Sequence, residues 1–277
     1  MGILETICEE RRADAARNKR ERPASSLERE ASPPRPAFRA ESHRSASPSG
    51  LLIAECKRAS PSRGLLVEAY EPVRLARAYE RGGAGLVSVL TEDRHFLGAD
   101  EHLALVRQAI GLPVLRKDFV VDPYQIDEAW AIGADAILLI ADALGENELC
   151  DFGSRAHELR MSVLVELREL DQLGKVLAAK PDAVGVNSRD LRDFSVHRDK
   201  ATAMAAYLKA ALPEGTLLVA ESGMRATGDL AALREAGYRG FLVGEALATA
   251  SDPEAATRLF TAAAKGGDAA KKGTICA

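Results

Sequence analysis

Residues 112–140, LPVLRKDFVVDPYQIDEAWAIGADAILLI, decide the fold of this chain. An apolar, β-prone run centred on Leu115 is followed by an amphipathic segment over residues 124–132, and a second apolar run is centred on Leu138. A strand, a helix and a second strand of these lengths predict a βαβ unit, in which the two strands are parallel.

The same alternation continues in both directions along the chain. β-prone runs are centred near Ile53, Ser88, Leu115, Leu138, Leu164, Gly185, Val219 and Leu242. Segments of helical length and amphipathic pattern follow them, for example residues 67–81 and 229–236. Eight such units use the whole span, which favours an α/β fold of the closed (β/α)8 TIM barrel type.

An open, doubly wound sheet is the alternative to the barrel. Such a sheet would need a dinucleotide or phosphate fingerprint in its first turn. Gly82, Gly83 and Gly85 lack the third glycine of GxGxxG, and the chain has no GxxxxGK[ST]. We therefore expect the barrel to occupy residues 48–264.

The two ends of the chain differ from the barrel region. Residues 1–47 are predicted to be a helical extension that covers the barrel mouth, since Ile3, Leu4, Ile7 and Cys8 form an apolar stripe at helical spacing. The Pro- and Ser-rich residues 31–50 indicate a connector lying over a surface. Residues 265–277 lack periodicity, which predicts a disordered tail.

A basic run in the extension, residues 11–22, has two interpretations. It could be a nucleic-acid patch, but the interspersed Asp14 and Glu21 favour a solvated helix face. The whole chain of 277 residues also carries a formal charge of −4, from 37 Lys and Arg against 41 Asp and Glu. Nucleic-acid binding needs a clustered basic footprint, so we expect no nucleic-acid partner.

Membrane, disulfide and metal functions are also disfavoured by the sequence. The longest apolar stretch, residues 136–141, is far shorter than the roughly 18 residues of a membrane span. No apolar signal-peptide core follows Met1, which predicts a cytoplasmic protein. The cysteines at 8, 56, 150 and 276 are scattered, which indicates reduced thiols, and the histidines show no HExxH or zinc-type spacing, so no metal site is expected.

Charged residues close several of the predicted strands. Barrel enzymes place catalytic groups at the carboxyl ends of their strands, and residues two apart in a strand share a face. The residues with the parity of the barrel interior are Glu55, Lys57, Lys117, Glu166 and Glu221, all from odd-numbered strands. One such residue alone is usually a solvated loop residue, but five with matching parity indicate one ionisable site. Arg116 and Asp118 have the opposite parity and are expected to point outward or to support the site residues from behind.

Glycines in the last two units suggest where an anion would bind. Ser222 and Gly223 follow the seventh strand, and Gly244 precedes a helix start at Glu245. The loops after strands seven and eight often form a phosphate cup of backbone N–H groups. Tight-turn geometry is the alternative explanation for both glycines. Glu245 is awkward beside an anion, so we expect its side chain to point away.

Six strings together carry a family resemblance. They are IAECKRASPSRG (53–64), residues 112–140 quoted above, VLVEL (163–167), VGVNSRDL (184–191), VAESG (219–223) and FLVGEAL (241–247). In this order and spacing the chain resembles the indole-3-glycerol phosphate synthases over about residues 1–263, including a helical extension. The resemblance implies tryptophan biosynthesis: 1-(2-carboxyphenylamino)-1-deoxy-D-ribulose 5-phosphate is converted to indole-3-glycerol phosphate, CO2 and water, without a metal or organic cofactor.

The resemblance also implies a role for each matching residue. Lys117 would be the general acid at the ketose oxygen, Glu166 would act in the later dehydration coupled to Glu55 and Lys57, and Asn187 would orient the ribulose hydroxyls. Arg189 would steady the anthranilate carboxylate. The remaining implied substrate-binding residues are Ser60, Phe96, Phe119, Glu221, Ser222, Gly223, Gly244 and Glu245. Core packing is an equally good explanation for Phe96.

Two other functions stay open at this point. A phosphoribosylanthranilate isomerase would want a Cys general base at the end of strand one, where Cys56 has the outward parity and Lys57 takes the end position. A non-catalytic barrel is the other alternative. We expect a small phosphorylated substrate, a monomer, and no membrane contact; association with other tryptophan-pathway enzymes stays open. Residues 39–50 are hard to align with the family.

Overall fold

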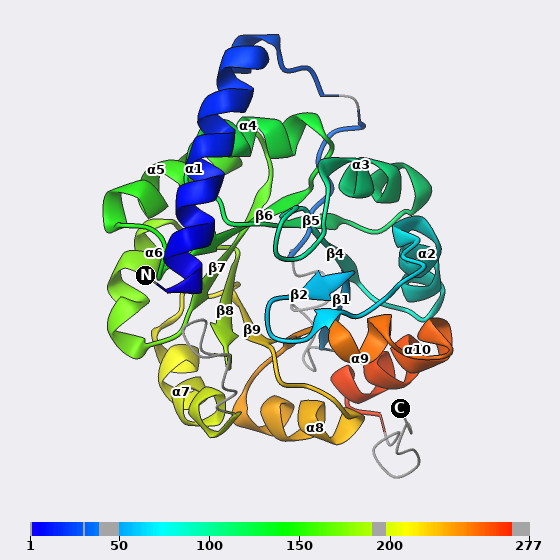
Figure 1. Cartoon of the computed structure of the whole chain (residues 1–277). Coiled ribbons are helices and arrows are strands. Elements are labelled where there is room, and N and C mark those ends of the chain that lie inside the picture. Colours follow the sequence, from blue (N-terminus) through cyan, green and yellow to red (C-terminus); the bar gives the residue numbers. More distant parts are fainter. Residues whose placement is uncertain (1, 30, 39–49, 190–197, 268–277) are drawn as a thin grey trace.

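The computed structural model describes residues 2–29, 31–38, 50–189 and 198–267. Eight parallel strands close into a barrel in the order β1-β10-β9-β8-β7-β6-β5-β4 (Figure 1). They are β1 (Leu51–Cys56), β4 (Leu86–Leu90), β5 (Val114–Lys117), β6 (Ala136–Ile140), β7 (Ser162–Leu167), β8 (Ala183–Asn187), β9 (Leu217–Glu221) and β10 (Gly240–Val243). Each predicted strand centre lies within one of them, so the TIM-barrel prediction is confirmed.

Helices surround the barrel in Figure 1. They are α2 (Pro72–Arg81), α3 (Asp100–Ala109), α4 (Tyr124–Ala131), α5 (Glu146–Glu158), α6 (Leu173–Ala178), α7 (Arg198–Ala211), α8 (Thr227–Ala236) and α10 (Pro253–Ala264). The shorter elements are the turns η1 (Ala24–Ser26) and η2 (Leu170–Gln172), the hairpin β2 (Ala59–Ser60) and β3 (Gly64–Leu65), and α9 (Glu245–Ala248). The helix predicted over residues 67–81 begins only at Pro72, because proline favours the first helical turn and pushes Glu71 out of the helical region.

The barrel interior is apolar below its carboxyl-terminal end. Leu115, Leu138 and Leu164 are almost fully buried inside the sheet. The strand register determines which residues form the layer above these leucines. Asn187 lies opposite Glu221 in the neighbouring strand, and Ile140 lies opposite Glu166. Because these strands are parallel and share one interior, the register places their terminal polar residues at one end of the barrel.

Helix α1 (Ile3–Glu21) lies against loops at the carboxyl ends of the strands. Arg11 is buried, and its Nη2 lies 2.7 Å from Asp118 Oδ2. Asp14 accepts two hydrogen bonds from Arg94, at 2.5 and 2.8 Å. The interpretation of residues 11–22 as a solvated face is therefore wrong for Arg11, because acidic residues of the barrel cover it.

The connector after α1 is less exposed than its composition suggested. Arg35 donates its backbone N–H to Asp135 at 2.7 Å, and Ala37 donates to Ser162 Oγ at 3.5 Å. Phe38 is buried in the core. Since Asp135 and Ser162 lie at the amino ends of β6 and β7, residues 35–38 lie at the amino-terminal end of the barrel. Residues 39–49, the rest of this connector, and residues 268–277 of the predicted tail lie outside the described residues.

Two further observations concern the described part of the chain. None of its helices is long and apolar enough to cross a membrane. Cys8, Cys56 and Cys150 are free thiols.

Candidate active site

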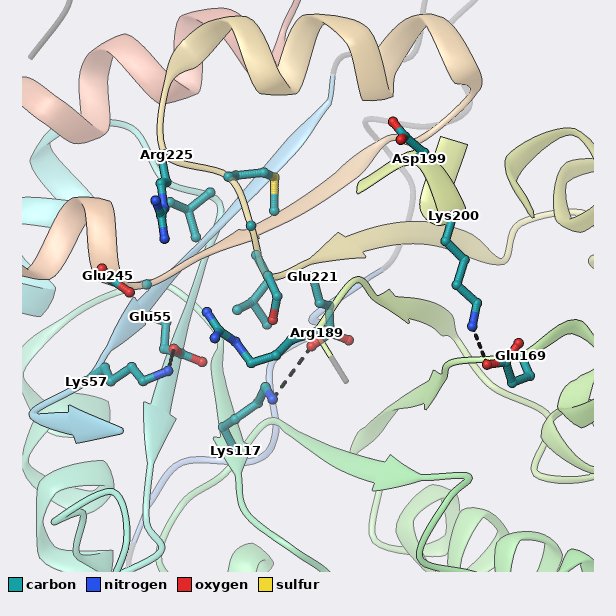
Figure 2. Close-up of a pocket in the computed structure, with 16 residues that line it drawn as sticks. Glu55, Lys57, Lys117, Glu169, Arg189, Asp199, Lys200, Glu221, Arg225 and Glu245 are labelled. Carbon is teal, nitrogen blue, oxygen red and sulfur yellow. Dashed lines mark hydrogen bonds and ion pairs between the residues drawn. The ribbon is translucent and has the colours of Figure 1, made fainter. Parts of the chain in front are cut away.

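A cavity of about 860 Å3 opens at the carboxyl end of the barrel (Figure 2). Predicted site residues in its wall are Glu55, Lys57, Lys117, Arg189, Glu221, Ser222, Gly223, Gly244 and Glu245. Residues that the sequence did not single out complete the wall: Glu169, Asp199, Lys200, Met224, Arg225, Leu242 and Val243. The cavity therefore gathers side chains from strand ends that are far apart in the sequence.

Lys117 lies between two carboxylates at the end of β5. Its Nζ is 3.6 Å from Glu221 Oε2 and 3.7 Å from Glu166 Oε2, and Figure 2 shows it directed toward Glu221. Burial lowers the pKa of Lys117, but the negative charges of Glu221, Glu166 and Glu55 outweigh burial and raise that pKa above its usual value. Lys117 is therefore an ammonium, with a proton to donate, at neutral pH.

The surroundings of Glu221 raise its pKa. Burial, then the neighbouring Glu166, raise the pKa of Glu221 to about 8, although Lys117 acts in the opposite direction. Its Oε1 is buried and makes no hydrogen bond to the described residues. The pKa of Lys117 and the pKa of Glu221 therefore depend on each other.

Asn187 joins Glu166 to the next loop. Its Nδ2 donates to Glu166 Oε1 at 2.9 Å, and its Oδ1 accepts the backbone N–H of Arg189 at 3.0 Å. Both amide atoms of the side chain are engaged, so its orientation is fixed. Asn187 and Glu166 do not line the cavity directly, but Glu166 reaches it through Lys117.

Lys57 connects the acidic cluster to an aromatic wall. Its Nζ lies 3.5 Å from Glu55 Oε1 and 5.4 Å from the ring centre of Phe96. Phe96 in turn packs at 6.0 Å from Phe119, centre to centre. The two phenylalanines are thus brought together beside Lys57, with their rings tilted by 39°, but neither lines the cavity. Ser60 is buried in β2 and does not line the cavity; its carbonyl accepts the N–H of Arg63.

Glycines make room for two of the acidic side chains. A Cβ at Gly185 would lie 1.9 Å from Glu221 Oε1, and one at Gly244 would lie 2.4 Å from Glu55 Oε1. Gly244 is therefore needed for close packing against Glu55, which the sequence could not show.

The turn after β9 has an uncommon backbone. Ser222 and Gly223 adopt φ of 65° and 79°, in the left-handed region. Positive φ is rare for serine, and strained backbone of this kind is often found at functional sites.

Glu245 lies beside the cavity. It lines the wall, and its Oε1 lies 3.2 Å from Arg63 Nε. We expected Glu245 to point away from the anion site. In the structure it stays at the cavity wall, and Arg63 offsets its charge. We did not identify Arg63, in the hairpin β2–β3, or Arg225, after β9, from the sequence. For Arg225, the available signal was a basic residue two positions after Gly223.

One group of potential metal ligands occurs in the described parts of the chain, formed by Glu10, Glu92 and His95 outside the cavity. Glu92 accepts the backbone N–H groups of Arg94, His95 and Phe96, and His95 contacts Glu10 at 2.9 Å. The ligand atoms are thus already used to shape the loop that carries Phe96.

Comparisons with known proteins identify the family of this chain. The family model described as indole-3-glycerol phosphate synthase matches residues 4–260. Proteins of that name are 43% identical in Chlorobium phaeovibrioides (91% of this chain, 96% of the relative) and 41% identical in Azospirillum brasilense (94% and 99%). The solved structure of 3-hexulose-6-phosphate synthase shares the fold at 17% identity, with a TM-score of 0.61 over 77% of this chain and 99% of that one. The chain belongs to the indole-3-glycerol phosphate synthase family.

Proposed function

We propose that this protein is a carboxy-lyase that closes the indole ring in tryptophan biosynthesis. Its substrate would be 1-(2-carboxyphenylamino)-1-deoxy-D-ribulose 5-phosphate, and its products indole-3-glycerol phosphate, CO2 and water. The observation that carries the proposal is the protonated Lys117 between Glu166 and Glu221 inside one cavity. Family membership supports the same reaction.

Lys117 would act in the first bond-forming step. The ring carbon that bears the carboxylate attacks the ketose carbonyl carbon, and Lys117 protonates the oxygen as its negative charge develops. A buried ammonium suits both tasks, because it donates a proton and stabilises the oxyanion before the proton moves. Loss of CO2 then restores the aromatic ring, and the electron pair of the broken C–C bond returns to it.

Glu166 would act in the dehydration that follows. The hydroxyl formed in the first step leaves as water, and a proton must be removed to complete the indole double bonds. Asn187 holds Glu166 through a 2.9 Å hydrogen bond, so the carboxylate has a fixed direction. Glu55 and its partner Lys57 would relay protons or orient the ribulose hydroxyls.

Opposite ends of the substrate would bind at different walls. Ser222, Gly223 and Gly244 would form the phosphate cup in the loops after the last two barrel strands, with Glu245 at its rim. As the family resemblance implies, Phe96, Phe119 and Arg189 would hold the anthranilate part, and Ser60 would complete the hydrogen-bonding ring. Fixing both ends brings the reacting carbons into contact, which can lower a barrier by about 7–11 kcal/mol.

The alternative function as a phosphoribosylanthranilate isomerase finds no support at Cys56. This thiol is fully buried, with Sγ 3.8 Å from the carbonyl of Pro72, and burial raises its pKa. A thiol in that position is not a base for a substrate in the cavity.

Several wider features belong to the same proposal. Residues 1–47 would be an extension that covers the barrel mouth, since α1 contacts loops at that end. We also propose a cytoplasmic monomer that needs no cofactor and takes its substrate from the preceding biosynthetic enzyme. The direct test is to incubate the purified protein with the carboxyphenylamino-deoxyribulose phosphate and follow indole fluorescence; no fluorescence increase would refute the function.

A further inference from the structure

The proposed phosphate cup contains an unfavourable charge. Glu245 follows Gly244 directly and lines the same cavity as Ser222 and Gly223. A phosphate monoester is close to dianionic at neutral pH, and a carboxylate beside it would repel it. Unless that charge is offset, Glu245 would weaken the binding of the substrate that the cup is shaped to hold.

Arg63 is placed to offset it. The hairpin β2–β3 turns at this residue: Arg63 N–H donates to the Ser60 carbonyl at 3.2 Å, and Gly64 follows with φ of 66°. The guanidinium then lies with Nε 3.2 Å from Glu245 Oε1. The pair joins the loop after the first barrel strand to the helix after the last one, across the rim of the cavity.

Further positive charge gathers around the same carboxylate. Arg189 Nη1 donates to Ser62 Oγ at 3.3 Å, in the same hairpin. Burial, then the positive charges of Arg225 and Arg63, lower the pKa of Arg189, and Glu245 opposes that shift. Glu245 therefore interacts with Arg63 and with Arg189, and Arg225 lines the same cavity.

We propose that Arg63 and Glu245 form a charge-compensating pair that sets the affinity for the phosphate-bearing end of the substrate. Arg63 neutralises Glu245, so that the cup accepts an anion, while Glu245 keeps the rim from holding the phosphate too tightly for product release. Both are positioning residues that act on binding, and the inference rests on the proposed function because it needs the phosphate to occupy this cup.

A double-mutant cycle tests the pair: Arg63→Ala, Glu245→Gln and the double variant, with KM and kcat measured by indole fluorescence. Exposed ion pairs contribute modestly, so we expect Arg63→Ala to raise KM about three- to fivefold at low salt, with kcat changed by less than about twofold. Glu245→Gln should lower KM. In the Glu245→Gln background, Arg63→Ala should change KM by less than about 1.5-fold, since no charge is left to offset.

Three controls separate this from other causes. Arg63→Lys should restore most of the affinity, because it keeps the charge. Arg258→Ala removes a similarly exposed arginine from its pair with Glu254 on α10, where neither residue lines the cavity, and should leave KM unchanged. The Arg63→Ala effect should shrink at high salt, because the Debye screening length falls from about 10 Å at 0.1 M salt to about 3 Å at 1 M. The inhibition constant of inorganic phosphate should change in parallel with KM.

The inference is overturned if Arg63→Ala leaves KM unchanged, if it raises KM equally in the Glu245→Gln background, or if only kcat falls. The second result would mean that Arg63 contacts the substrate independently of Glu245. Failure of the proposed function itself looks different, since the unmodified enzyme would then form no indole product.

Discussion

The guanidinium of Arg11, in helix α1, lies 2.7 Å from the carboxylate of Asp118, the residue next to Lys117. Asp118 is fully buried, and its Oδ2 also accepts the hydroxyl of Thr91 at 2.5 Å, while Oδ1 accepts the N–H of Phe119 at 2.8 Å. One carboxylate thus ties helix α1 to the segment that carries the proposed acid and the aromatic wall.

Removing the arginine of this pair takes a charged hydrogen bond from the buried Asp118, which keeps Arg116 Nη2, 3.4 Å away, as its remaining cation. We expect Arg11→Ala to lower the free energy of unfolding by about 1.5–3 kcal/mol, measured by urea denaturation, and to lower kcat through misplacement of Lys117. Arg20→Ala, at an exposed position of the same helix, is the matched control and should change stability by less than about 0.5 kcal/mol. A loss below about 1 kcal/mol for Arg11→Ala would contradict the proposed anchoring role.

The raised pKa of Glu221 predicts a pH-dependent stability. In the folded state the pKa of Glu221 is raised to about 8 from its ordinary 4.5. Between these values the folded state binds more protons than the unfolded state, so the stabilisation from Glu221 is complete below pH 4.5 and is lost as pH rises toward 8.

Glu221→Gln removes this titration and keeps the shape. Relative to the Gln variant, the unmodified protein should therefore lose unfolding free energy between pH 5 and 8, as measured by urea denaturation at several pH values. Parallel pH curves for the two proteins would show that Glu221 does not hold the proton.

Glu166 is proposed to act after the ring has closed. Glu166→Gln keeps the hydrogen-bonding capacity next to Asn187 but removes the base, so we expect nearly intact substrate binding and a dehydration slowed by at least about 100-fold. Single-turnover kinetics separate CO2 release from indole formation. Indole formation that keeps pace with CO2 release in the variant would argue against this role.

Gly185 is expected to be required for the position of Glu221. A Cβ there would lie 1.9 Å from Glu221 Oε1, so Gly185→Ala should displace that side chain and lower both stability and kcat. At Gly174, in α6, an added Cβ would have no atom within 4 Å. Gly174→Ala should therefore stabilise the protein slightly, by up to about 1 kcal/mol. Equal melting temperatures for the two variants would contradict the steric argument.

The fold and the acidic cluster could be predicted from the sequence, because the alternation of side chains along a strand is a local pattern. Glu55, Lys117, Glu166 and Glu221 share the parity of the barrel interior, and eight parallel strands leave that interior one polar end. The start of α2 at Pro72 could also have been deduced, since proline favours the first helical turn.

Other features depend on partners that are distant in the sequence. The burial of Arg11 needs Asp118, and the compensation of Glu245 needs Arg63; neither residue's own neighbours indicate the contact. The raised pKa of Glu221 likewise depends first on burial and then on Glu166 and Glu55 from other strands, so no local pattern could predict it.

The central claim is that the ammonium of Lys117 donates the proton for ring closure. The most direct measurement is indole fluorescence with the unmodified protein and with Lys117→Ala, after circular dichroism has shown that both are folded. The account predicts a variant that binds substrate but turns over at least about 1,000-fold more slowly. Turnover by Lys117→Ala at a rate near that of the unmodified protein would contradict it.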